Sequence, residues 1–140
     1  VAYFWFYLMI VLEQLKLLVN LSRIDGAMIS RERNYIINIG KAHGFPESSV
    51  ETLFYTTHDI IIPADLTDDQ KFNYIFNLVQ LMKIDERLYE DEIKFCANVA
   101  SKLGYQPQVM FELMLRIKSD EMSVEEKDSL KELTSKFLAA

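Results

Sequence analysis

The chain has few of the residues that would point to a disulfide-rich, metal-bound or loop-dominated fold. Its 140 residues include one cysteine, four glycines, three prolines and two histidines. A single cysteine, Cys96, excludes an internal disulfide framework and any zinc site built from several cysteines. Because Cys96 lies on an apolar face between Phe95 and Val99, we interpret it as a small core residue. A chain of this length is expected to form one domain that needs neither disulfides nor metal to fold.

Positive charge is also scarce, since 15 lysines and arginines face 21 acidic residues and the net charge is -6. This balance argues against nucleic-acid binding, in which phosphate neutralisation dominates the affinity. The sequence has no Ser/His/Asp or Cys/His arrangement, no phosphate-binding glycine loop and no Glu-x-x-His motif of the di-iron bundles. We interpret His43 as a cap near a helix C-terminus, where a cation is favoured, and His58 as part of a surface turn. The sequence therefore predicts a protein without catalytic activity.

The spacing of apolar residues is helical almost throughout, and strict alternation is nowhere sustained. Ser30 suits the N-cap of a helix, and Thr67-x-x-Gln70 and Ser123-x-x-Glu126 are capping boxes. We expect an all-α domain of about seven helices over 1–140, with a hinge at 58–66. The expected helices run to about residue 24 and then over about 30–43, 46–57, 67–84, 90–103, 107–118 and 123–139.

An internal repeat is the most informative feature of the chain. Residues 18–25 match residues 78–85 without a gap, sixty residues apart, and the match continues to Gly44-Phe45 and Gly104-Tyr105. Repeats of this kind form stacked or symmetric supersecondary units. We therefore predict two related helical units with a pseudo-twofold relation, at about 17–57 and 77–118, followed by a closing helix.

Each repeat carries an Asp that is followed seven residues later by a Glu, which a hydrophobic core does not require. In the first copy, Asp25-Gly26 and Glu32 match the second half of an EF-hand loop. The positions of the missing first half hold Leu21 and Arg23, so an ordinary EF-hand is excluded. One interpretation is helix punctuation, with Asp25 in an Asx turn and Glu32 in the first turn of a helix.

The second copy leaves a cation site open as the other interpretation. Five carboxylates occupy the eight residues from Asp85 to Glu92, and Glu86 replaces the turn glycine. Like charges at this density need solvent, a counter-ion or a bound cation. A site built from Asp85, Glu92 and Glu86, or shared with Asp25 and Glu32, would favour Mg²⁺, Ca²⁺ or Mn²⁺ because all its ligands are oxygens. A solvated acidic edge with no cofactor is the alternative.

The N-terminus is an unbroken apolar run over residues 1–12 that ends at Glu13. It is shorter than the roughly 20 residues of a membrane span and has no basic region before it, so we expect neither a complete anchor nor a signal peptide. Either it is a helix buried in the protein or docked on a second copy, or it is the stub of a membrane anchor. Its aromatic residues, which suit protein and membrane interfaces alike, are Tyr3, Phe4, Trp5, Phe6 and Tyr7.

These motifs resemble the TerB-like family, the tellurite-resistance protein B group, over about residues 17–115. The resemblance rests on Ile24-Asp25-Gly26-x-Met28-x-x-x-Glu32 and on the second copy from Asp85 to Glu92. It implies a compact helical domain, a metal-chelating acidic face at Asp25, Glu32, Asp85 and Glu92, and a role in stress response or assembly. It also implies a cytoplasmic location near the inner face of the membrane.

Three functions follow from the sequence. The first is a non-enzymatic TerB-like module that binds a divalent cation or a protein partner through its acidic loops. The second is a structural interaction domain whose aromatic N-terminal helix makes a homodimer or membrane contact without any metal. The third is an acid–base enzyme using the carboxylates, which requires a concave pocket.

Overall fold

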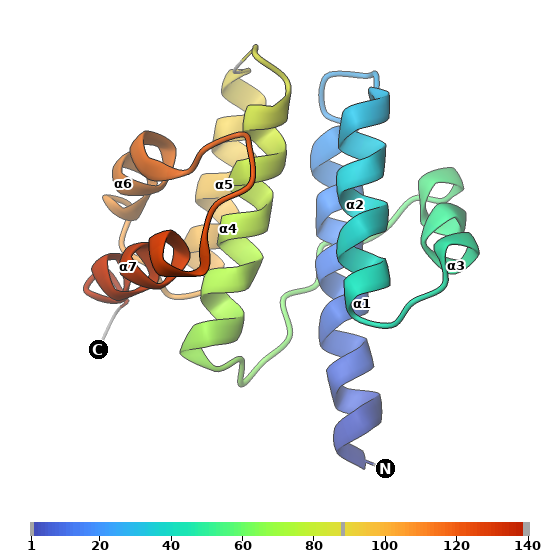
Figure 1. Cartoon of the computed structure of the whole chain (residues 1–140), viewed down its shortest axis with the longest axis horizontal. Helices are drawn as coiled ribbons and strands as arrows, with labels where there is room; N and C mark the ends of the chain where they lie inside the picture. Colours follow the sequence, from blue (N-terminus) through green and yellow to red (C-terminus); the bar gives the residue numbers. More distant parts are fainter. Residues whose placement is uncertain (1, 88, 139–140) are drawn as a thin grey trace. The chain divides into compact units, whose positions relative to one another are not determined.

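The computed structural model describes residues 2–87 and 89–138, and within them it forms helices and no β-strand. The all-α prediction is therefore confirmed (Figure 1). An isolated antiparallel bridge joins Tyr105 to Leu138. The described residues form seven α-helices and one 3₁₀ helix, which is labelled η1. In chain order these are α1 (Ala2–Ser22), α2 (Ser30–Ala42), α3 (Glu47–Glu51), η1 (Thr52–Tyr55), α4 (Asp68–Ile84), α5 (Glu90–Lys102), α6 (Val109–Arg116) and α7 (Val124–Ser135).

The chain divides into two compact units, Val1–Pro63 and Ala64–Ala140. The boundary falls within the hinge that the sequence predicts at 58–66. The grouping of all 140 residues into one domain stays a prediction.

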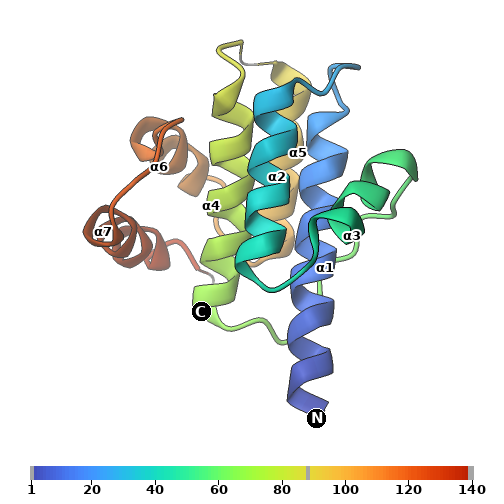
Figure 2. The same ribbon diagram turned by 45° about the vertical axis from the view of Figure 1, so that its right-hand side comes forward.

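The first unit is built on α1, which packs against α2 and η1, while α2 also packs against α3 (Figure 2). Its fully buried side chains include Leu15, Leu18 and Ile36. Gly40 allows α2 and α3 to approach closely, because a Cβ atom added there would lie 2.5 Å from a methyl carbon of Val50. The packing of this unit therefore requires a glycine at position 40 as well as buried apolar side chains.

The second unit is built on α4, which packs against α5, α6 and α7. Ile75, Leu78, Val109 and Leu113 are fully buried in its core. Cys96 is fully buried as well, and burial raises the pKa of its thiol to about 12. The interpretation of Cys96 as a core residue is confirmed.

Local structure repeats at the same sixty-residue interval as the sequence. Helices α2 and α5 have equal lengths and begin sixty residues apart. Each is followed by a glycine with positive φ, +92° at Gly44 and +99° at Gly104, a conformation that favours glycine at a helix C-terminus. These matches concern each unit alone, so the pseudo-twofold relation stays a prediction.

The helix boundaries follow the sequence with small corrections. Both capping boxes are confirmed, because Gln70 and Glu126 each exchange hydrogen bonds with the predicted N-cap residue three positions earlier. Ser30 was expected as an N-cap, but it is the first helical residue and Ile29 occupies the cap position. The helix expected over 46–57 is two short pieces, α3 and η1.

Candidate functional site

The first acidic pair is engaged by its own backbone. Asp25 follows the end of α1, and its Oδ1 accepts a hydrogen bond from the Ala27 N–H at 3.2 Å, which is an Asx turn. Glu32 is 2% exposed, and its Oε1 accepts a hydrogen bond from the Ile29 N–H at 3.1 Å. This bond satisfies one donor at the start of α2, where four N–H groups have no partner within the helix. Both residues therefore act as helix punctuation.

The second pair repeats part of this geometry. Asp85 Oδ1 accepts a hydrogen bond from the Arg87 N–H at 3.1 Å, which reproduces the Asx turn of Asp25. Glu92 is 2% exposed, as Glu32 is. The other carboxylates of this loop, Glu86, Glu90 and Asp91, are exposed, and Glu90 pairs with Lys94 at 3.0 Å.

At least three of the five residues predicted as metal ligands accept a backbone hydrogen bond, and the other two differ in their exposure. Asp25, Glu32 and Asp85 each give an oxygen to a nearby backbone N–H, so a cation would compete with these bonds. Glu92 is buried, and Glu86 faces solvent. In the described ranges 2–87 and 89–138, no group of three or more His, Cys, Asp or Glu side chains is arranged to hold a metal ion. Cation binding at these residues stays a prediction.

The basic residues before each acidic loop have a structural role that the sequence does not reveal. Arg23 donates hydrogen bonds to the carbonyl oxygens of Leu53, Phe54 and Thr56 around the end of η1. Lys83 donates to the carbonyl oxygens of Met114 and Ile117 at the end of α6. The last carbonyls of a helix have no partner within the helix, and a cation is favoured there.

A second polar position repeats in the same way. Asn20 donates to the His58 carbonyl oxygen at 3.0 Å, and Gln80 donates to the Lys118 carbonyl oxygen at 2.9 Å. Both bonds span 38 residues of sequence. The repeated polar residues of α1 and α4 therefore fix the segment that follows η1 in the first unit and α6 in the second.

His43 connects α2 to the aromatic end of α1. It lies at the C-cap of α2, as expected, and its Nδ1 is hydrogen-bonded to the Tyr7 hydroxyl. The two rings lie 5.7 Å apart. The expectation that this site favours a cation is not met, because burial lowers the pKa of His43 and so favours the neutral imidazole.

The aromatic residues predicted to form an interaction surface are exposed. Tyr3 is 90% exposed, Phe4 60% and Trp5 66%, while Phe6 and Tyr7 are exposed by more than two fifths. Burial begins abruptly at Ile10 and Val11, which belong to the core. Figures 1 and 2 both show the N-terminal turns of α1 extending beyond α2.

Helix α1 is longer than the apolar run at its start. Its segment Tyr3–Ser22, 20 residues long, is long and apolar enough to cross a membrane, although half of it is buried in the protein. Core helices of soluble proteins meet the same criterion. Length and composition therefore do not distinguish a core helix from a membrane helix here. What distinguishes α1 is that its first turns are exposed and that it is buried from Ile10 onward.

Comparison with protein-family models, curated proteins and solved structures finds no match to this chain. The structure engages the acidic loops in helix capping and leaves the N-terminal turns of α1 largely exposed, with Tyr7 in contact with His43 of α2.

Proposed function

We propose that this chain is a non-enzymatic module that contacts a membrane through the N-terminal turns of α1, residues 3–9. One observation carries the proposal: five consecutive aromatic side chains are 41–90% exposed on a regular helix. An exposed apolar patch of this kind marks a contact surface. Tyrosine and tryptophan favour the boundary between lipid and water.

The distribution of these side chains around the helix favours lipid over a second copy. Successive residues of an α-helix are separated by about 100°, since a turn takes about 3.6 residues. Residues 3–6 therefore surround the helix instead of forming one stripe, while Tyr7 also contacts His43 of α2. A protein partner with a single contact face would cover only part of this surface, whereas lipid would cover all of it.

The buried part of α1 limits the depth of insertion. Ile10 and Val11 are 4% and 3% exposed, and the core continues from there along the helix. The seven residues before Ile10 extend over about 10 Å, which matches the depth that interfacial helices reach. We propose that residues 3–9 of α1 enter the membrane surface and that insertion stops before Ile10, because deeper insertion would remove core residues from the first unit.

Hydrophobic transfer would supply the binding energy. The first charged residue of the chain is Glu13 and the first basic residue is Lys16, so no cation lies in the inserted turns. Full burial of one large apolar side chain contributes roughly 1.5–3 kcal/mol. Membrane binding should therefore depend little on salt or on anionic lipid.

Flotation with phosphatidylcholine vesicles tests the proposal. We expect the protein to float with vesicles, and Phe4→Ser/Phe6→Ser to reduce its partition coefficient by roughly tenfold or more. Phe111→Ser is the matched control, because Phe111 is 70% exposed on α6, and it should leave partitioning unchanged. A protein that stays in solution, but whose mass rises with concentration until the Phe4/Phe6 substitutions abolish the increase, would instead be a homodimer.

A TerB-like module that binds a divalent cation at the second acidic loop is a second candidate. It is favoured by the exposure of Glu86 and Asp91, whose side chains make no hydrogen bond or ion pair within the described ranges. Free ion at about 100 times its Kd would stabilise the protein by about 2.7 kcal/mol. Melting of EDTA-treated protein with Ca²⁺, Mg²⁺ or Mn²⁺ measures this, and Asp85→Asn should abolish any shift. The absence of a shift with all three ions would reject this candidate.

A further inference from the structure

An open groove of about 500 Å³ runs along α7 in the second unit. Met122, Leu130 and Leu133 supply its apolar lining, and Glu125 and Ser129 stand at its edge. Met122 and Leu130 are buried, whereas Glu125 and Ser129 are exposed. An apolar side chain that enters this groove would therefore meet methionine and leucine beneath a polar edge.

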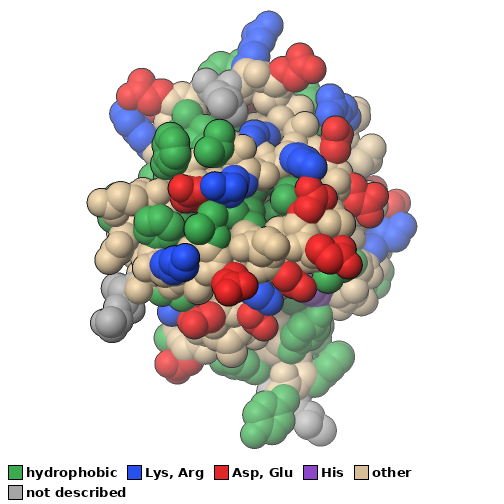
Figure 3. Space-filling view, turned by 60° about the vertical axis from the view of Figure 1, so that its left-hand side comes forward, with side chains coloured by type: hydrophobic (Ala, Val, Ile, Leu, Met, Phe, Trp, Pro, Cys, Tyr) green, Lys and Arg blue, Asp and Glu red, His purple; other side chains and the backbone are tan. Residues whose placement is uncertain are grey.

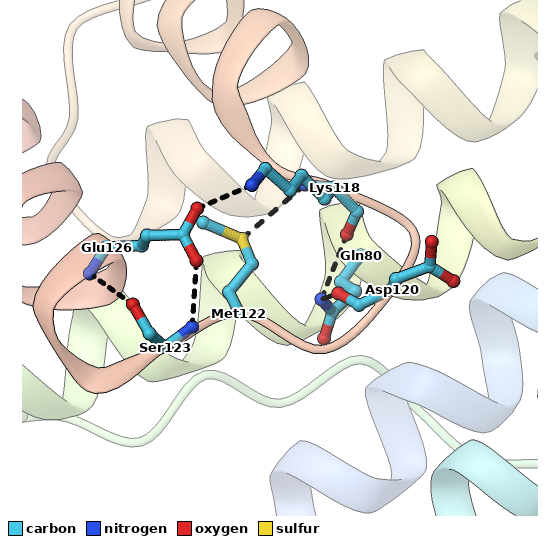
Figure 4. A network of polar contacts seen from close by, with 6 residues as sticks. All are labelled: Gln80, Lys118, Asp120, Met122, Ser123 and Glu126. Atoms are coloured by element: carbon cyan, nitrogen blue, oxygen red, sulfur yellow. Dashed lines mark hydrogen bonds and ion pairs between the residues drawn. The ribbon is translucent and has the colours of Figure 1, made fainter.

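The wall of the groove is held in place by a hydrogen-bonded loop between α6 and α7 (Figure 4). Gln80 Nε2 donates to the carbonyl oxygens of Lys118 and Asp120, each at 2.9 Å. Lys118 Nζ bonds Glu126 Oε2 at 2.6 Å, and the Lys118 N–H donates to the sulfur of Met122 at 3.5 Å. Because these contacts lie within the unit, the groove is formed before any partner binds.

Four cations around α7 are already engaged, and one of them is Arg116, which lines the groove and pairs with Glu112 at 2.7 Å. Lys136, at the C-cap of α7, makes no ion pair with any described residue. Lys118 pairs with Glu126, Lys131 pairs with Asp69 and Asp128, and Lys127 lies over the ring of Phe76. Figure 3 shows hydrophobic side chains on the face turned forward there, with both acidic and basic side chains around them. The exposed acidic side chains on α7 and in the loop before it that make no ion pair with any described residue include Glu121, Glu125 and Glu132.

We infer that this groove binds a basic amphipathic helix of a partner protein. The apolar face of such a helix would fill the groove, and its lysines or arginines would lie opposite Glu121, Glu125 and Glu132. Helices bind in apolar grooves in this way in several recognition modules, and complementary charge selects the partner. The inference concerns α7 and does not depend on membrane contact by α1.

The charge of the chain argues against other occupants. A second copy carries the same net charge of -6, and the aromatic tip of its α1 has no basic residue before Lys16. Nucleic acid and anionic lipid would be repelled by the unpaired carboxylates. A cationic helix is therefore the partner whose chemistry fits both the lining and the edge.

Binding can be tested with a labelled amphipathic peptide of leucine and lysine, followed by fluorescence anisotropy. A scrambled peptide of the same composition has the same charge but no apolar face. We expect saturable binding of the amphipathic peptide only, with an affinity that falls as salt rises because the charges are exposed.

Two variants locate the site. Glu125→Lys reverses an unpaired charge at the edge and should weaken binding by roughly fivefold to tenfold. Ser129→Trp places an indole in the groove and should abolish binding. Asp59→Lys, an exposed charge reversal in the first unit, is the matched control and should bind as the unaltered protein does. Thermal melting of each variant checks that it is folded. Where Ser129→Trp does not fold, the result with Glu125→Lys decides the test by itself.

Three results of the binding experiment would overturn the inference, and one result on the mass of the chain would do so as well. The first is equal binding of the scrambled peptide, and the second is failure of the amphipathic peptide to bind the unaltered protein. The third is an affinity that neither groove variant changes. A concentration-dependent mass of the chain alone that Ser129→Trp abolishes would also reject it, because the groove would then bind a second copy.

Discussion

Arg23 and Lys83 donate to carbonyl oxygens that are also sixty residues apart, those of Phe54 and Met114. Each cation thus lies at the end of one long helix and bonds carbonyls at the end of a later helix of its own unit, η1 for Arg23 and α6 for Lys83. In the sequence, Arg23 serves only to exclude an EF-hand. The structure shows that Arg23 and Lys83 stabilise the unit in which they lie.

Replacement of Lys83 by methionine tests this role. The substitution leaves the carbonyls of Met114 and Ile117 without their donor, and we expect the free energy of unfolding to fall by about 1–3 kcal/mol. Lys83→Arg should retain most of the stability. Urea denaturation measures the change, with the exposed Lys94→Met as control. Equal effects of the substitutions at Lys83 and Lys94 would show that Lys83 has no special role.

Gly40 offers a test of the packing between α2 and α3. A Cβ atom there would lie 2.5 Å from Val50 Cγ2, so we expect Gly40→Ala to destabilise the protein by about 1–3 kcal/mol. Val50→Ala removes the methyl groups that clash. In the double variant the two costs should therefore not add, as a double-mutant cycle can measure. Additive costs would contradict the close approach.

Glu126 should make stability depend on acidic pH. Hydrogen bonds from Lys118 and from the Ser123 backbone lower the pKa of Glu126 from 4.5 to about 2. A carboxyl with a lowered folded pKa stabilises the folded state above its unfolded pKa, and this contribution is lost as pH falls from about 4.5 towards 2. Glu126→Gln should therefore make the free energy of unfolding less steep over that range. A slope equal to that of the unaltered protein would reject this assignment.

His43 should make the stability of the fold depend on pH near neutrality. Burial lowers the pKa of His43 in the folded state below the ordinary 6.5. Between the folded pKa and 6.5 the unfolded chain therefore binds more protons than the folded one. Stability is then complete above pH 6.5 and falls as the pH drops through the folded pKa. His43→Gln should remove this decline, and His58→Gln serves as the histidine control. A decline that persists in His43→Gln would assign it to another group.

Local signals in the sequence predict the helices well. The capping boxes at Thr67 and Ser123 involve residues three positions apart, and both form as expected. The roles of Arg23 and Lys83 depend on contacts with residues thirty or more positions away, which no local pattern reports. The sequence does anticipate the Asx turn of Asp25, because a short side chain after a helix acts on the backbone two residues further on.

Exposure of the N-terminal aromatics could not be predicted from their sequence. An apolar run without a polar stripe is expected of a helix buried on all sides and of one inserted in lipid. Only the point at which packing begins separates these cases. In the structure that point is Ile10, so Tyr3–Met9 lie outside the core.

Fluorescence of Trp5 tests membrane contact most directly, because Trp5 is the only tryptophan and it lies in the exposed turns. We expect its emission to shift to shorter wavelength when phosphatidylcholine vesicles are added. Lipids brominated near the top of the acyl chain should quench it more strongly than lipids brominated near the end, since insertion is about 10 Å deep. Emission that is unchanged by vesicles, and that aqueous iodide quenches equally with and without them, would contradict the account.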